Sequence, residues 1–222
     1  VFLGLALLMS LSAGAETVVI EATRDATLIE DPLGERANGS GPFFFAGRTS
    51  QAQNGIRRGL LYFDVAAALP TGAAVESVAL QLKHQSGNSG THEVRLRRLQ
   101  ADWREGASSA SGGGGAPSMP GDVTWRHTSY DGEFWVRPGG QFLGRVSATA
   151  QVEGNGTYTW DSTSHLVQDV RLWLANPRRN FGWIVIGDET SGQTAKRFAS
   201  RENPDPASRP RLEITYRMSG RP

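Results

Sequence analysis

Two stretches of the chain, at positions 75–85 and 92–99, alternate between apolar and polar residues, most clearly at 78–83 and 94–97. Such alternation is typical of a β-strand with one face in the core and the other in solvent. Ser, Gly and Asn residues between the two stretches favour a turn, so we expect the strands to pair as a hairpin. The inward positions are then Val78, Leu80, Leu82, Val94 and Leu96, and the outward positions are Gln81, Lys83, Arg95 and Arg97.

Other short apolar stretches, separated by turn residues, predict further strands at residues 17–22, 26–30, 43–47, 57–65, 181–187 and 211–216. Residues 181–187 are apolar at consecutive positions, which indicates a strand buried on both faces. Residues 164–177 have apolar residues at helical spacing, so we expect one amphipathic helix there. Many short strands and one helix predict an all-β protein, an antiparallel jelly-roll β-sandwich with one short surface helix.

One internal segment, residues 106–122, has low complexity and contains four consecutive glycines. Such composition predicts a mobile loop. Neither flank of this loop is complete without the other, so we expect a single domain over residues 16–217, followed by a tail at 218–222.

The first residues form an apolar stretch, residues 1–11, which is shorter than the roughly 20 residues that a membrane span needs. Ala13-Gly14-Ala15 follows and fits the A-x-A pattern of signal peptidase. We therefore expect residues 1–15 to be a signal peptide, truncated at its start, that is removed before Glu16. No other stretch is apolar enough to span a membrane, so the mature chain is expected to be secreted.

The composition excludes several classes of function and of structural support. The formal net charge is +1, which gives no general attraction to nucleic acid. The chain has no Cys, so its fold does not depend on disulfides and it has no thiolate nucleophile or zinc–thiolate site.

Catalytic and metal motifs are weak. The four His residues show no metal-ligand spacing, and the trio Ser162, His165 and Asp169 matches a triad only by residue type. The acidic loops 30–35 and 187–192 could bind calcium, but they lack an EF-hand pattern and are more typical of solvated turns. We therefore predict no cofactor, while a pair of distant carboxylates for glycoside hydrolysis stays open.

Several segments together resemble one known family. They are "RRGLLYFDVAAALPTGAAVESVALQL" at 57–82, "ADWREG" with "VTWRH", "HLVQDVRLW", "NFGWIVIG", and the closing "RFASRE" with "RPRLEITY". In this order they resemble the DNRLRE domain family, classed as carbohydrate-binding module family 96, over residues 20–216. The resemblance implies a secreted jelly-roll sandwich that binds polysaccharide, notably alginate-like polyuronates, without catalysis. We expect a single domain here, without the second domain often found in the family, and the glycine-rich loop also departs from the family.

We expect most of the remaining charged and aromatic residues to have structural roles. Arg201 and Glu202 precede the last strand, and we interpret them as structural ion pairs or caps and not as catalytic groups. Trp160, Trp173 and Trp183 lie within strand or helix patterns and are expected in the core. Trp135 is flanked by charge and glycine, so it is either an exposed platform for a sugar ring or a loop anchor.

The outward face of the predicted hairpin is the candidate ligand site. It carries Lys83, Arg95 and Arg97, and Arg58 and Tyr62 extend it if their strand lies alongside, with Trp135 at the rim. Arginine suits carboxylate ligands, which predicts an acidic polysaccharide as the partner. A merely solvated strand face is the alternative for these residues. For the whole protein, a structural or adhesive exoprotein is the main alternative, and a polysaccharide lyase or hydrolase is a third.

Overall fold

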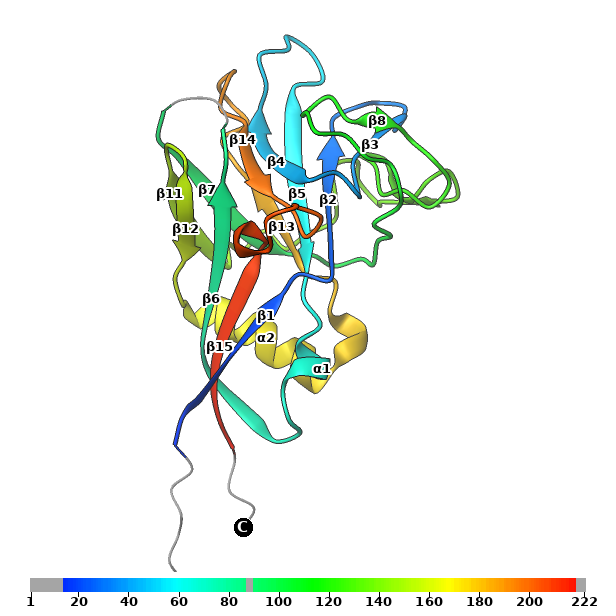
Figure 1. Ribbon diagram of the computed structural model, residues 1–222. Coiled ribbons are helices and arrows are strands. Elements are labelled where there is room, and N and C mark those ends of the chain that lie inside the picture. Colours follow the sequence, from blue (N-terminus) through cyan, green and yellow to red (C-terminus); the bar gives the residue numbers. More distant parts are fainter. Residues whose placement is uncertain (1–13, 87–89, 219–222) are drawn as a thin grey trace, which may run out of the picture.

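The computed structural model describes residues 14–86 and 90–218 and confirms the antiparallel β-sandwich (Figure 1). Most of the predicted signal peptide, residues 1–13, lies outside the described part, as do residues 219–222 of the predicted tail. The last strand, β15 (Arg211–Met218), ends one residue beyond the predicted domain boundary.

The first layer, here called sheet A, is built around the long strand β6 (Ala73–His84). One edge of β6 pairs with β15 and then, at His84, with β14 (Lys196–Ala199). Its other edge pairs with β12 (Gly156–Trp160). The layer is completed by β1 (Glu16–Glu21) beside β15 and β4 (Phe43–Arg48) beside β14.

The second layer, sheet B, has the strand order β2-β5-β13-β7-β11. Its strands are β2 (Arg24–Ile29), β5 (Ile56–Tyr62), β13 (Trp183–Ile186), β7 (His92–Arg98) and β11 (Ala148–Val152). The end of β4 pairs with β5, so the layers join there. Consecutive strands repeatedly cross between the layers, as in β6 to β7 and β13 to β14, which is the connectivity of a jelly roll.

The predicted hairpin between residues 75–85 and 92–99 is wrong, although both strands exist. β6 lies in sheet A and β7 in sheet B, and neither pairs with the other. Their apolar residues, including Leu80 and Leu96, are fully buried in the same core and face each other across the sandwich. Alternation predicts which face of a strand is buried, but it does not say which strand lies beside it.

The core between the layers contains the three tryptophans expected there. Trp160, Trp173 and Trp183 are all 0% exposed. Trp183 and Val185 of β13 point into this core, whereas Ile184 and Ile186 belong to a second apolar cluster on the outer face of sheet B. The prediction that β13 is buried on both faces is therefore confirmed.

The predicted helix is confirmed as α2 (Ser164–Ala175), which begins where Thr163 Oγ1 accepts a hydrogen bond from the Leu166 N–H. It packs on the inner side of β6 (Figure 1), and its residues Asp169 and Trp173 also contact Trp183 of sheet B. A short helix, α1 (Val65–Ala68), and the 3-10 turns η1 (Pro177–Arg179) and η2 (Pro206–Ser208) were not expected. None of the helices in the described ranges is both long and apolar enough to cross a bilayer.

The chain between β7 and β11, residues 99–147, forms a third layer on the outer face of sheet B (Figure 1, green). Its regular elements are short: β8 (Ala116–Pro117), which pairs with β3 (Arg36–Ala37), and β9 (His127–Ser129), which pairs with β10 (Glu133–Phe134). Trp103, Val123 and Trp135 from this layer pack on Leu28, Leu60 and Ile184 of sheet B.

In the structure, the segment 106–122, for which the sequence predicts a mobile loop, has one arrangement that is anchored by hydrogen bonds at Ser108 and Asp122, while its other residues are exposed or partly exposed. The Asp122 carboxylate is 0% exposed and accepts hydrogen bonds from the N–H groups of Ala107, Ser108 and Met119 and from the Ser108 hydroxyl. Gly106 has φ +79°, and an added Cβ would lie 1.9 Å from an Asp122 oxygen. The glycines here allow close packing, which composition alone cannot distinguish from flexibility.

Candidate functional site

The third layer covers only half of the outer face of sheet B. It lies over β2, β5 and β13, whose outward residues are buried in the second cluster. The outward side chains of β7 and β11 are left exposed or partly exposed, among them Arg95, Arg97, Thr149 and Gln151. We call this region the open strip. Thr149 pairs with Arg95 and Gln151 with Glu93 across the two strands.

Arg95 and Arg97 therefore lie on an accessible face of one strand, as predicted. Arg95 Nε donates to Glu93 Oε1 at 2.5 Å, and the Arg95 side chain is 46% exposed. Arg97 Nη1 donates to the carbonyl of Gly144, and its guanidinium carbon lies 6.0 Å from the centre of the Phe142 ring. The positive charge of Arg95 is offset by the Glu93 carboxylate, whereas Arg97 contacts only a neutral carbonyl.

Arg58 lies in the same row of sheet B, since Ile186 pairs with both Arg58 and Arg95. The third layer and the loop after β13 both contact its side chain. Arg58 forms a two-point ion pair with Glu189 at 2.7 and 2.9 Å, donates to the Gly139 carbonyl, and stacks on Trp125. These contacts make Arg58 a structural residue, which fixes Gly139, Trp125 and Glu189 beside the open strip.

Tyr62 also lies on this face, but at its covered end. The Arg24 guanidinium lies 4.2 Å from the centre of the Tyr62 ring, and the same group stacks on Trp103 at 4.9 Å. Burial is the largest cause that raises the pKa of Tyr62 above its ordinary value. The Tyr62 ring already has a stacking partner and lies away from the open strip.

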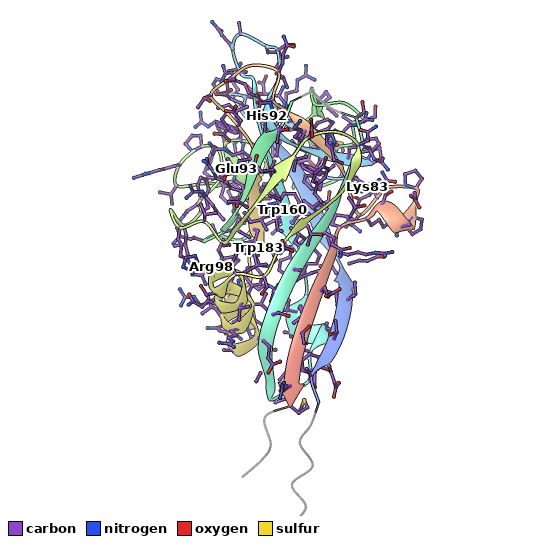
Figure 2. The ribbon with its side chains drawn as sticks, turned by 90° about the vertical axis from the view of Figure 1, so that its left-hand side faces the viewer. Lys83, His92, Glu93, Arg98, Trp160 and Trp183 are labelled. Carbon is purple, nitrogen blue, oxygen red and sulfur yellow. The ribbon has the colours of Figure 1, made fainter. Side chains whose placement is uncertain are left out.

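Lys83 does not belong to this site. It points outward from sheet A, so the whole sandwich separates it from β7. Figure 2 shows Lys83 on one side of the molecule and Glu93 on the other, with the buried Trp160 between them. The basic patch predicted from Lys83 together with Arg95 and Arg97 is therefore wrong, because it depended on the hairpin.

Trp135 is an anchor and not a platform. It is 4% exposed, and its Nε1 donates a hydrogen bond to the Thr124 carbonyl at 2.9 Å. Its neighbours Phe134 and Val136 are instead exposed, at 55% and 78%. The sequence left open a sugar-stacking platform and a loop anchor for Trp135, and the structure shows the loop anchor.

Two clefts lie at the ends of the open strip. The first, of about 460 Å³, is lined by residues 91–93, Arg95 and residues 186–190. The second, of about 520 Å³, is lined by Gln100, Val136, Arg137, Gly140, Gln141, Phe142 and Gly144. Arg97 connects them, because it follows Arg95 on the same face of β7 and contacts Gly144 and Phe142 of the second cleft.

Another cleft, of about 340 Å³, lies on the outer side of sheet A beside Phe45 and Arg197. Its arginine is already engaged: Arg197 Nε donates to the Gln85 carbonyl at 2.6 Å, and the guanidinium lies 4.2 Å from the centre of the Phe43 ring. The open strip is the stronger candidate, because it joins two clefts along one strand and carries Arg95, Arg97 and Arg137, whereas this cleft is lined by a single arginine.

The structure does not assemble a catalytic triad from Ser162, His165 and Asp169. Asp169 is 0% exposed and binds Arg145, Ser147 Oγ and Trp183 Nε1 at 2.7, 2.5 and 3.0 Å. Ser162 Oγ accepts from the N–H of Val78, and the exposed His165 lies against the Val146 carbonyl. The Asp169 carboxylate therefore stabilises the junction of α2 with sheet B.

The acidic loops considered for calcium use their carboxylates in turns. Asp31 accepts from the N–H groups of Leu33 and Glu35, and Asp188 accepts from Thr190. These hydrogen bonds are the largest cause that lowers the pKa of Asp188. Within residues 14–86 and 90–218, no three His, Asp or Glu side chains are grouped so that they could hold a metal ion.

The charged residues before the last strand are structural, as interpreted from the sequence. Arg201 pairs with Glu105 of the third layer and with Glu202, and its backbone N–H donates to Asp25 Oδ2 at 2.6 Å. Asp25 is 2% exposed, and its burial raises its pKa well above the ordinary value. This cluster connects the third layer to both sheets.

A comparison with protein-family models gave no match, and a comparison with curated proteins gave none either. The resemblance to the DNRLRE family therefore rests on the sequence motifs quoted above.

Sequence reasoning missed Arg137, which is exposed and lines the second cleft. It lies two residues after Trp135, in the same stretch that drew attention to the tryptophan. The available signal was Pro138-Gly139-Gly140, because a turn directly after Arg137 favours exposure of that residue.

Proposed function

We propose that this protein is an exported, non-catalytic module that binds an acidic polysaccharide along the open strip of sheet B. One observation carries the proposal. Arg137 lines the second cleft and Arg97 borders it, and neither forms an ion pair with any residue in the described part of the chain. A guanidinium donates two parallel hydrogen bonds to a carboxylate, which suits a uronate sugar.

The surroundings of these arginines also suit a carbohydrate. Thr149 and Gln151 on β11 offer hydroxyl and amide groups beside β7, and Gln100 and Gln141 do the same in the second cleft. Side chains on one face of a strand repeat about every 7 Å, so the strip presents polar groups at regular intervals. A polymer of sugar units can meet such a surface at several points.

Export is proposed from the sequence. Residues 1–15 have the apolar stretch and the A-x-A ending of a signal peptide. The motifs shared with the DNRLRE family support the same location and the same class of ligand.

Affinity electrophoresis in gels with and without alginate tests the proposal. We expect alginate to retard the wild type, and to retard an Arg95→Ala/Arg97→Ala double variant less. Lys83→Ala/Arg211→Ala is the matched control, since it removes two positive charges from sheet A, on the other side of the sandwich. Retardation should weaken as salt rises, because the Debye length falls to about 8 Å at physiological ionic strength.

Equal retardation of the wild type and the Arg95→Ala/Arg97→Ala variant, with both folded by circular dichroism, would remove the open strip from consideration. A rise in ultraviolet absorbance during incubation with alginate would report new unsaturated chain ends. That result would replace the binding module with a lyase.

A further inference from the structure

The two clefts and the open strip form one path along β7. Glu93, Arg95 and Arg97 project from the same face of the strand, and Glu93 lines the first cleft while Arg97 borders the second. From Glu93 to Leu99, where β7 leads into the second cleft, six residue steps of strand cover about 20 Å. This length exceeds a single sugar ring, so a bound chain places different sugars in the two clefts.

The first cleft contains three carboxylates, each with a basic neighbour. Glu93 pairs with Arg95 and Glu189 with Arg58, and Asp188 lies 3.4 Å from His92 Nδ1. The positive charges near this cleft are therefore already balanced by protein carboxylates. An anionic sugar entering it would meet carboxylate oxygens without an unpaired cation to offset the repulsion.

The second cleft has the opposite character. No Asp or Glu lines it, and Arg137 is exposed at its edge. Arg97 borders it and donates only to the neutral Gly144 carbonyl among the described residues. Val136 and Phe142 provide apolar contact for the face of a sugar ring.

We infer that the ligand is a polysaccharide whose carboxylates are spaced apart by neutral sugars, and not one with a carboxylate on every residue. An acidic sugar binds in the second cleft through Arg97 and Arg137. A neutral sugar binds in the first cleft, where its hydroxyl groups donate to Glu93, Asp188 and Glu189. The inference rests on the proposed function and specifies the ligand class of the same site.

The probe is alginate whose carboxyl groups are methyl-esterified to graded extents, because the backbone then stays constant while the spacing of charges changes. We expect the wild-type affinity to pass through a maximum at intermediate esterification. Arg137→Gln should lower the affinity at each charged composition about two- to fivefold, the range for an exposed ion pair. Glu93→Gln removes one carboxylate from the first cleft, so its maximum should move toward less esterified alginate.

Glu213→Gln is the matched control, since Glu213 is exposed on sheet A and its variant should keep the wild-type profile. An affinity that falls steadily as esterification increases, with the same profile in Glu93→Gln, would overturn this inference and leave the proposed function standing. Absence of binding to every sample, native alginate included, would instead overturn the proposed function.

Discussion

Arg201 and Glu105 form a two-point ion pair, with Nε–Oε1 and Nη2–Oε2 distances of 2.7 and 2.6 Å. Glu105 belongs to the third layer, and Arg201 to the loop before the last strand. Glu105 Oε1 also accepts the backbone N–H of Asp25 in β2, at 2.7 Å. One carboxylate therefore connects three segments that are distant in sequence.

Removal of Arg201 should destabilise the fold. Arg201→Ala leaves Glu105 and Glu202 together without their cation, while the backbone N–H of residue 201 can still donate to Asp25. We expect a loss of about 2 kcal/mol in the free energy of unfolding, between the values for exposed and buried pairs, because the Arg201 side chain is 37% exposed. Urea denaturation measures the loss.

The control for Arg201 is Arg217→Ala, which breaks the exposed pair with Glu76. This change should cost no more than about 0.5 kcal/mol. Equal losses in the two variants would mean that the Arg201 cluster contributes no more to stability than an exposed ion pair does.

The stability should depend on pH through Asp25. Burial raises its folded-state pKa above the unfolded value, so its protonated form favours the folded state. This contribution is complete below the unfolded pKa, about 3.9, and is lost as the pH rises through the folded pKa. The unfolding free energy of the wild type minus that of Asp25→Asn should therefore fall as the pH rises above about 4. A difference that stays constant over this range would contradict the assignment.

Asp122 should be essential for the third layer. Asp122→Ala leaves the N–H groups of Ala107, Ser108 and Met119 without their acceptor. The Ser108 donor is buried and the other two are partly buried, and an unsatisfied buried donor costs about 1–3 kcal/mol, so we expect a loss of about 2–3 kcal/mol. Thermal denaturation of Asp122→Ala checks this, with Ser109→Ala as the exposed control in the same loop. An Asp122→Ala variant with the wild-type melting temperature would show that these hydrogen bonds do not stabilise the fold, as expected for a mobile loop.

Leu80 and Gln81 test the register of β6. Leu80 is 0% exposed, so Leu80→Ala should cost about 2–5 kcal/mol. Gln81 points to the other face and is only partly buried, and Gln81→Ala should cost about 0.5 kcal/mol or less. Chemical denaturation of both variants gives the comparison, and similar losses would show that the faces are assigned wrongly.

The sequence by itself determined the local elements and their buried faces. The alternation in 75–85 and 92–99, the consecutive apolar residues in 181–187 and the helical spacing in 164–177 all correspond to elements of the structure. These patterns are local, because the period of apolar residues follows directly from strand and helix geometry. They were sufficient to predict an all-β sandwich with the correct core tryptophans.

Only the tertiary structure decided which strands are neighbours and which outward residues stay exposed. Lys83 and Arg95 are both outward in the sequence pattern, yet they lie on opposite sides of the molecule, because β6 and β7 belong to different sheets. Arg58 and Arg97 are outward on the same sheet, yet Arg58 is ion-paired with Glu189, whereas Arg97 donates to the neutral Gly144 carbonyl beside a cleft. Strand pairing and loop packing depend on contacts between distant residues, and the period of one strand holds no information about them.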